Sequence, residues 1–369
     1  MADDTDRRWA AQIACERRLS GTPPLTPRQR LEAFSAGGFD LDERPDWYGD
    51  GAVRRLEERV AELLGKADAA VFPSGTMAQQ VALHCWASRS GNRAVAMHPM
   101  QHLQRHEREA FTVLSGLQPV WLTREPRQPT PEEVAGLDEP FGTLMVELPL
   151  RDPGYLLPTF DELSGMVTAA RERGAYVHFD GARLWESTPY LGQDLAGVAA
   201  LADSVYVSFY KTLQGLSGAA LAGSSEFVAQ ARAWRHRYGG NVFSQWPAVF
   251  TALHGLDTIL PRLGGYVAYA REVAKVLGEL PGARVHPDPP HTHQFQLWLP
   301  HPARVLNEAA LKLAERDKAW FAYGWQDRPP TGLSMVEVTV GEPAMSLSPS
   351  EVTEMAAAFL SLVRELSSV

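Results

Sequence analysis

Short apolar segments alternate with amphipathic helical segments through the middle of the chain, and this alternation limits the possible folds more than any other feature. The strand-like segments are AAVF, TLMVEL, AYVHFD and SVYVSFY, at residues 69–72, 143–148, 175–180 and 204–210. Helical patterns such as FDELSGMVTAARERG separate them. Because parallel strands need helical crossovers that cover both faces of the sheet, the sequence predicts an α/β fold around a mainly parallel sheet.

The same pattern divides the chain into three expected parts. Residues 1–45 mix charges with Gly, Pro and Ser, so we expect an N-terminal arm with one or two short helices. Residues 46–255 carry the alternating pattern and predict a large domain. The segments QFQLWL and MVEVTV and the helical patterns around them predict a smaller α+β domain over residues 256–369.

Composition excludes several classes of protein. The chain has 369 residues, 45% of them hydrophobic, which provides a sizeable core and excludes global disorder. A net charge of −9 gives no basic surface for nucleic acid, and no apolar stretch reaches the ~18 residues of a membrane span. The N-terminal MADDTDRRWA is charged where a signal peptide is apolar, and the chain has only two cysteines, Cys15 and Cys85. We therefore expect a cytoplasmic protein.

Lysine is scarce, so a reaction that needs a lysine has few candidates. Only five of the 35 basic residues are lysines, and four of these lie on charged helical patterns. Lys211 instead ends an apolar segment and precedes TLQGLSGAALAG, a run rich in small residues. Burial there would lower the pKa of the amine and favour imine formation. The alternative, which fits Lys211 equally well, is a strand-end lysine that extends into solvent.

Two further motifs follow predicted strands, where an α/β sheet binds its ligands. Asp180 ends AYVHFD, and a carboxylate there can keep the ring nitrogen of pyridoxal phosphate protonated. Ser74, Gly75 and Thr76 lie between a strand and a helix, where amides and hydroxyls bind phosphate. Each motif alone also fits an ordinary helix cap or turn. Together with Lys211, their order along the chain is that of fold-type I pyridoxal phosphate enzymes.

His102 lies between the phosphate motif and the aspartate, in HPMQHLQRHERE. An imidazole there could cover a cofactor ring and move protons near neutral pH. The alternative is that His98, His102 and His106 are solvated residues of a helix surface. Leu103 stands where a zinc-binding HExxH motif needs glutamate, and HPDPPHTH is a proline-rich loop, so we expect no metal site.

With these motifs in place, the sequence resembles the threonine aldolase and β-eliminating lyase family of pyridoxal phosphate enzymes. The resemblance rests on DWYGDGAVRRLEERVAELLGKADAAVFPSGTMAQQVAL at 46–83, HFDGARLWES at 178–187, SFYKTLQGLSGAALAG at 208–223 and ARAWRHRYGG at 231–240. It covers residues 46–260 well, is fainter in the C-terminal domain and is absent from the first 45 residues. It implies a fold-type I transferase fold with a large and a small domain.

The resemblance also implies roles for individual residues. Lys211 would bind pyridoxal phosphate covalently, and Asp180 would contact its ring nitrogen. His102, with Glu107 five residues later, matches the family's stacking histidine and would also act in catalysis. The full set of implied cofactor-binding residues is Ser74, Gly75, Thr76, His102, Asp180, Ser208 and Lys211.

The substrate carboxylate is where the sequence departs from the family. By position, Arg183 would bind this carboxylate and Tyr48 would reach the site of a neighbouring subunit. The family has a further arginine on a late strand, where MVEVTVG carries Glu337, and one after Gly-Gly, where GGNVFSQ has none. A further departure from the family is Tyr210, the residue directly before Lys211. Because glutamate cannot replace the two hydrogen bonds of arginine, either Arg151 assists Arg183 or the substrate differs from threonine.

These observations lead to one expected function and two alternatives. The resemblance implies a lyase that cleaves the Cα–Cβ bond of a β-hydroxy-α-amino acid to glycine and an aldehyde. It also implies a homodimer or homotetramer with sites at the subunit interface. The altered arginines leave open β-elimination, racemisation or a biosynthetic transfer on a bulkier amino acid. A protein without enzymatic activity is the third alternative, against which the retained lysine, aspartate and phosphate motif argue.

Overall fold

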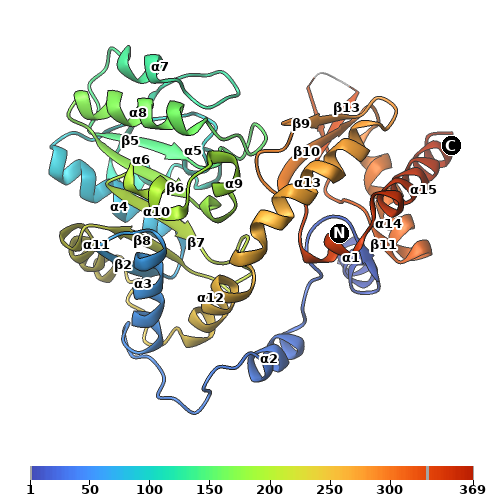
Figure 1. Cartoon of the computed structure of the whole chain (residues 1–369), viewed down its shortest axis with the longest axis horizontal. Helices are drawn as coiled ribbons and strands as arrows, with labels where there is room; N and C mark the ends of the chain where they lie inside the picture. The colour runs from blue at the N-terminus through green and yellow to red at the C-terminus, as the bar shows by residue number, and fades with distance from the viewer. Residues whose placement is uncertain (1, 330–331, 369) are drawn as a thin grey trace. The chain divides into compact units, whose positions relative to one another are not determined.

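The computed structural model describes residues 2–329 and 332–368, which form two compact units (Figure 1). Unit 1 combines the described residues of 1–31 and 262–369, and unit 2 comprises residues 32–261. The sequence-based division treats residues 1–45 as a separate arm, whereas in the structure this segment is shared between the two units. Among the described residues, no helix is both long and apolar enough to cross a membrane.

Unit 2 is built on a seven-stranded sheet with the order β2-β8-β7-β6-β5-β3-β4. Its strands are β2 (Asp68–Phe72), β3 (Ala94–Met97), β4 (Gln118–Trp121), β5 (Thr143–Glu147), β6 (Tyr176–Gly181), β7 (Ser204–Ser208) and β8 (Ala219–Gly223). The five strands from β4 to β7 in this order are parallel, and only β8 runs antiparallel to its neighbours β7 and β2. The prediction of an α/β fold with a mainly parallel sheet is confirmed.

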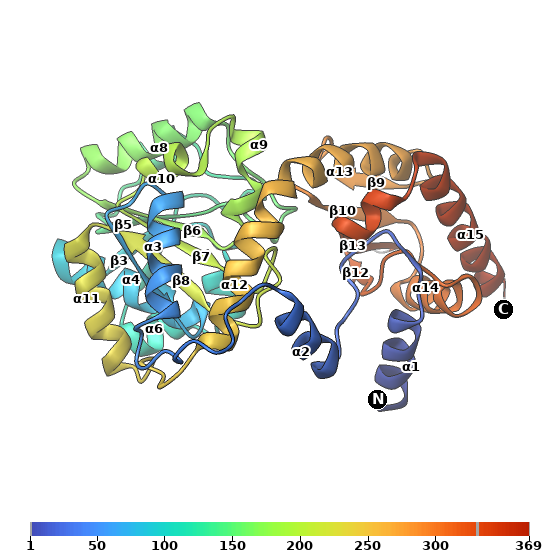
Figure 2. The same cartoon turned by 60° about the horizontal axis from the view of Figure 1, so that its bottom comes forward.

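Every residue of β5, β7 and β8 is buried, because helices cover both faces of this sheet. The helices are α3 (Ala52–Leu63), α4 (Gly75–Ser90), α5 (His102–His106), α6 (Ala110–Ser115), α7 (Pro131–Ala135), α8 (Phe160–Glu172), α9 (Thr188–Leu191), α10 (Leu195–Ala200), α11 (Ser225–Arg237) and α12 (Trp246–Thr258). Helix α2 (Pro27–Ala36) crosses the unit boundary. Helix α4 packs against β5 to β8 and α8 packs against β5 and β6 (Figures 1 and 2). Stacking of Trp86 on Phe227, with ring centroids 4.6 Å apart, anchors α4 to α11.

Unit 1 contains a four-stranded antiparallel sheet in the order β12-β13-β10-β9. The strands are β9 (Arg284–His286), β10 (Gln294–Leu299), β12 (Gln326–Arg328) and β13 (Leu333–Thr339), and the helices are α1 (Ala2–Ile13), α13 (Leu263–Gly278), α14 (Ala303–Asp317) and α15 (Pro349–Ser367). Both QFQLWL and MVEVTV form strands, as predicted. Phe295, Leu297 and Phe359 are fully buried in the shared core.

The N-terminal segment is an integral part of unit 1. Strand β1 (Arg17–Arg18) pairs in parallel with β11 (Ala319–Trp320). Leu19 is 0% exposed and belongs to the core of the sheet and helices. Arg7 forms ion pairs with Glu308 at 2.9 Å and Glu315 at 2.6 Å, both on α14. The first strand of the chain is therefore held by residues about 300 positions later.

Candidate active site

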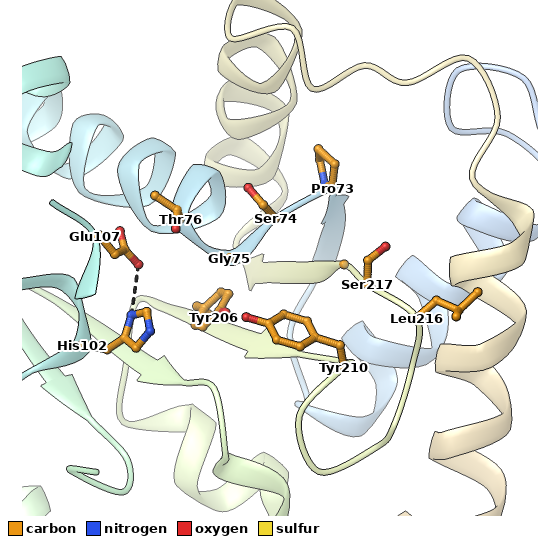
Figure 3. A pocket seen from close by; sticks show the side chains of 11 residues that line it. Pro73, Ser74, Gly75, Thr76, His102, Glu107, Tyr206, Tyr210, Leu216 and Ser217 are labelled. Atoms are coloured by element: carbon orange, nitrogen blue, oxygen red, sulfur yellow. Dashed lines mark hydrogen bonds and ion pairs between the residues drawn. The ribbon is translucent and has the colours of Figure 1, made fainter. Parts of the chain in front are cut away.

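A cavity of about 310 Å³ lies at one edge of the unit 2 sheet (Figure 3). The residues that line it are Pro73, Ser74, Gly75, Thr76, His102, Glu107, Tyr206, Tyr210, Leu216, Ser217 and Gly218. They follow the ends of β2 and β3, lie in β7 or follow its end, or precede the antiparallel β8. This is the carboxyl edge of the parallel strands, where α/β folds bind their ligands.

The turn before α4 provides an anion-binding surface in this cavity. Ser74 is the N-cap residue of α4, and its hydroxyl accepts the backbone N–H of Met77 at 3.3 Å. At Gly75 a methyl group would overlap the hydroxyl of Tyr206 and would lie 3.0 Å from its Cζ atom, so the close approach of this phenol to the backbone requires glycine. Free amides at the start of a 16-residue helix favour a phosphate group there. The predicted residues Ser74, Gly75 and Thr76 all line the cavity.

Asp180 lies in the middle of the same edge. It is 2% exposed, and in the sheet register it stands between Glu147 of β5 and Tyr206 of β7. Its Oδ1 accepts the backbone N–H of Ala182 at 3.1 Å, and it does not cap a helix, because the next helical turn begins only at Leu184. Burial raises the pKa of this carboxyl group, and the nearby positive charge of Lys211 opposes the shift.

Lys211 follows the end of β7 and is half-buried. Burial lowers the pKa of its amine, as does the positive charge of Arg183, while Asp180 and Glu147 raise it. A lowered pKa increases the fraction of neutral, nucleophilic amine. Lys211 itself is not among the lining residues of the cavity, but its neighbour Tyr210 is, and the phenol of Tyr210 points toward Tyr206 in Figure 3. The structure thus favours the buried interpretation over a lysine that extends into solvent.

His102 also lines the cavity. Its Nδ1 lies 3.3 Å from Oε1 of Glu107, as the dashed line in Figure 3 marks, and Glu107 also accepts the side-chain amide of Gln80 at 3.4 Å. His106 instead faces Asp152 at 3.0 Å, outside the cavity. In the part of the chain that the structure describes, no group of three or more His, Cys, Asp or Glu residues could hold a metal ion.

The two candidate carboxylate-binding arginines are both close enough to affect Lys211. The charge of Arg183, and to a smaller extent that of Arg151, lowers the pKa of the Lys211 amine. The guanidinium carbon of Arg183 lies 5.3 Å from the ring centroid of Tyr155. Among the described residues its Nε atom is buried without a hydrogen-bond partner.

Ser74, Gly75, Thr76 and His102 are the sequence candidates that line the cavity, whereas Asp180, Lys211, Arg183, Arg151, Ser208 and Tyr48 do not. Ser208, the last residue of β7, is fully buried. Tyr48 is 58% exposed with φ of 52°, and its ring contacts that of Phe243 at 5.3 Å between centroids. The structure therefore does not bring Tyr48 together with the cavity residues of its own chain.

The sequence analysis did not single out Leu216, Ser217 and Gly218, which line the cavity, or two residues with specific contacts in the site, Tyr206 and Glu147. Tyr206 lines the cavity, and its hydroxyl covers Gly75. Glu147 ends β5 beside Asp180, and its carboxylate binds the backbone of His102. A signal for Glu147 was present, because it ends TLMVEL as Asp180 ends AYVHFD. Only the register of β5 on β6 shows that the two carboxylates are neighbours.

Comparison with known proteins places this chain in a family. The model of the beta-eliminating lyase family matches residues 42–298. A low-specificity L-threonine aldolase of Arabidopsis thaliana is 26% identical over 280 residues, which cover 73% of this chain and 77% of that protein.

Solved structures extend the likeness to almost the whole chain. A "putative L-allo-threonine aldolase" from Listeria monocytogenes is 32% identical, covers 98% of this chain and 99% of its own, and superposes with a TM-score of 0.90. A protein from Exiguobacterium, described as an aromatic amino acid beta-eliminating lyase/threonine aldolase, gives 32% identity and a TM-score of 0.89 over 98% and 99% of the chains. The fold is fold-type I, as predicted. The chain belongs to the beta-eliminating lyase family, whose members use pyridoxal phosphate.

Proposed function

We propose that this chain is a pyridoxal phosphate-dependent lyase that cleaves the Cα–Cβ bond of a β-hydroxy-α-amino acid to glycine and an aldehyde. Relatives named threonine aldolase support the choice of reaction. The single observation that carries it is the arrangement at one sheet edge of the Ser74–Thr76 turn, buried Asp180 and Lys211.

The residues of this edge fit the cofactor. The first amides of α4 and the hydroxyls of Ser74 and Thr76 suit a phosphate group at the start of this helix. The buried carboxylate of Asp180 suits a protonated ring nitrogen, because a cation there would compensate its burial. Lys211, whose pKa is lowered, suits the covalent attachment.

The chain's own residues have distinct tasks in this proposal. Bound pyridoxal phosphate supplies a sink for the electrons of the broken bond. Asp180 would hold the ring nitrogen in its protonated form, and Lys211 would hold the cofactor through its amine. His102 accepts the proton of the β-hydroxyl at Nε2, because its Nδ1 faces Glu107 and the ring is therefore held in one orientation.

Two arginines bind the substrate carboxylate in this proposal. Arg183 has a buried Nε atom that no described residue hydrogen-bonds, and Arg151 lies within electrostatic range of Lys211. Bidentate contacts from arginine fix the orientation of a carboxylate. Such an orientation aligns the Cα–Cβ bond for cleavage.

We also propose that the chain forms a homodimer or homotetramer in which Tyr48 reaches a neighbouring site. Trp47, Tyr48 and Phe243 are 50%, 58% and 58% exposed, and such aromatic side chains are typical of interfaces. Sedimentation should show an oligomer. Tyr48→Ala should lower activity while the bound cofactor is retained.

Aldehyde release from threonine, allo-threonine and phenylserine tests the reaction. We expect release from at least one of them with the cofactor-loaded protein, and neither visible absorbance nor release with Lys211→Ala. The control is Lys275→Ala, an exposed lysine of α13, which should behave as wild type. Pyruvate and ammonia without aldehyde would support β-elimination instead, and a protein that takes up no cofactor would contradict the proposal.

A further inference from the structure

One buried carboxylate connects two loops of the candidate site. Glu147 is the last residue of β5 and is 4% exposed. Its Oε2 accepts the backbone N–H of His102 at 2.7 Å, and its Oε1 accepts the backbone N–H of Arg151 at 3.2 Å. His102 lies in the segment after β3, and Arg151 lies in the segment after β5. Both oxygens of one side chain are therefore used, one for each loop.

The hydrogen bond to His102 replaces a missing helix cap. His102 is the first residue of α5, and the N-cap residue Gln101 makes no side-chain cap hydrogen bond. The first amides of a helix have no partner within the helix and need one from elsewhere. Glu147 supplies that partner from a different strand, so the position of the His102 backbone depends on β5.

Burying the Glu147 carboxylate between two loops is energetically unfavourable. Burial raises the pKa of the Glu147 carboxyl group, and the adjacent Asp180 raises it further. Two carboxylates side by side in a buried site destabilise a fold unless other groups compensate. The N–H groups of His102 and Arg151 oppose the shift by binding the charged form. The need for an acceptor on each oxygen accounts for glutamate at this position.

We propose that Glu147 is a positioning residue of this site, which holds the backbones of His102 and Arg151 in one arrangement so that both side chains act on the same substrate molecule. This inference rests on the proposed function for the tasks of those two residues. In this role Glu147 touches neither substrate nor cofactor and acts through the loops that carry His102 and Arg151.

The position of β5 in the sheet does not depend on the Glu147 carboxylate. The main-chain oxygen of Glu147 accepts the side-chain amide of Gln128 at 2.9 Å, and β5 pairs with β6 along its whole length. A change confined to the carboxylate leaves these contacts in place. Glu147→Gln keeps the size of the side chain and one acceptor oxygen, but it turns an amide N–H₂ toward one of the two backbone donors.

The test measures substrate binding and turnover separately in Glu147→Gln. We expect wild-type amounts of bound cofactor by visible absorbance, a lower kcat because His102 is displaced and a higher KM because Arg151 is displaced. Together these should reduce kcat/KM by ~10- to 100-fold, the size of effect that small misplacements of reacting groups produce. Binding of glycine, followed through its effect on the cofactor spectrum, should weaken as well.

Two further variants separate positioning from a general structural effect. Glu107→Gln changes the partner of the His102 ring and not of its backbone, so it should lower kcat without weakening glycine binding. In Arg151→Ala, adding Glu147→Gln should weaken glycine binding no further, because both changes act through the same guanidinium. If Glu147→Gln is too unstable, Glu147→Asp, which is too short to reach both donors, should give the same pattern.

Unchanged kcat and glycine affinity in Glu147→Gln would overturn the inference, as would additive effects of Glu147→Gln and Arg151→Ala on glycine binding. Because glycine binding needs no bond cleavage, this readout is independent of the aldolase reaction. If Glu147→Gln weakens glycine binding and the wild-type protein releases no aldehyde, the positioning role is supported and the proposed function is contradicted.

Discussion

The position of the Tyr206 phenol in the cavity depends on the absence of a side chain at Gly75. A methyl group there would overlap the Tyr206 hydroxyl, so Gly75→Ala should displace the phenol, cost ~1–3 kcal/mol of stability and weaken cofactor binding. Tyr206→Phe in the same chain removes the overlapping oxygen and should restore part of the loss. Cofactor titration and thermal unfolding measure both effects.

The matched control is Gly264→Ala in α13, where nothing lies within 4 Å of the added methyl group. It should stabilise the protein by ~0.5–1 kcal/mol through helix propensity. Normal cofactor affinity in Gly75→Ala, or a double variant no better than the single one, would contradict the assigned contact.

His178 should make stability depend on pH. It is 0% exposed between Ser204 and Gln79, each 2.8 Å from one ring nitrogen, and burial lowers its pKa to about 3. Between pH ~3 and the unfolded value of ~6.5, the unfolded chain binds a proton that the folded chain excludes. Stability is therefore fully present above pH ~6.5 and falls by up to ~1.4 kcal/mol per pH unit as the pH drops through this window.

Urea unfolding at several pH values checks this slope. His178→Gln should be less stable at neutral pH but should show a flatter dependence between pH 4 and 6.5. Ser204→Ala, which keeps the imidazole, should lose stability at every pH and keep the slope. Equal slopes for wild type and His178→Gln would disprove the assignment.

The residues that sequence could identify are those with a local signal. Lys211 and Asp180 each end an apolar segment, and Ser74–Thr76 lie between a strand and a helix, so each position is visible in a short stretch. Their catalytic and binding roles stay predictions. The contact between Tyr206 and Gly75 and the bonds of Glu147 depend on strand register and loop paths, which no local pattern encodes.

At the scale of elements, α4 and α11 provide a matched pair of helix caps. Ser74 accepts the N–H of Met77 at 3.3 Å, and Ser224 accepts the N–H of Phe227 at 3.2 Å. Replacing either serine by alanine should cost ~1 kcal/mol of stability. Only Ser74→Ala should also weaken cofactor binding, because only Ser74 lines the cavity. Equal affinities in both variants would argue against phosphate binding at α4.

The sequence analysis found β2, β5, β6 and β7 of the large sheet and β10 and β13 of unit 1, all of which coincide with predicted apolar segments. It missed β3 and β4, which have four residues each and are too short for a clear period. β8 consists of AALAG, which lacks the β-branched and aromatic residues typical of strands. Its reversed direction has a visible cause, because the ten residues between β7 and β8 contain no crossover helix, which a parallel neighbour requires.

At the scale of the whole molecule, the first 31 residues stabilise unit 1. Leu19 is fully buried in the core of that unit, so Leu19→Ala should cost ~2–5 kcal/mol there. Hydrogen exchange should become faster in β10 and β13 and should stay unchanged in β5 to β7. Arg7→Ala, which removes two partly exposed ion pairs, should cost no more than ~1 kcal/mol per pair. Uniform acceleration across both units would contradict this division.

The pairing of β1 with β11 can form only late in protein synthesis. Residues 1–31 leave the ribosome first, but their partner strand and α14 follow only after the whole of unit 2 has been translated. Since domains fold as units during synthesis, unit 2 can fold on the ribosome while Leu19 still lacks its core. For most of its translation the nascent chain thus carries Leu19, an apolar residue in a largely charged and polar segment, without the core that covers it in the folded protein.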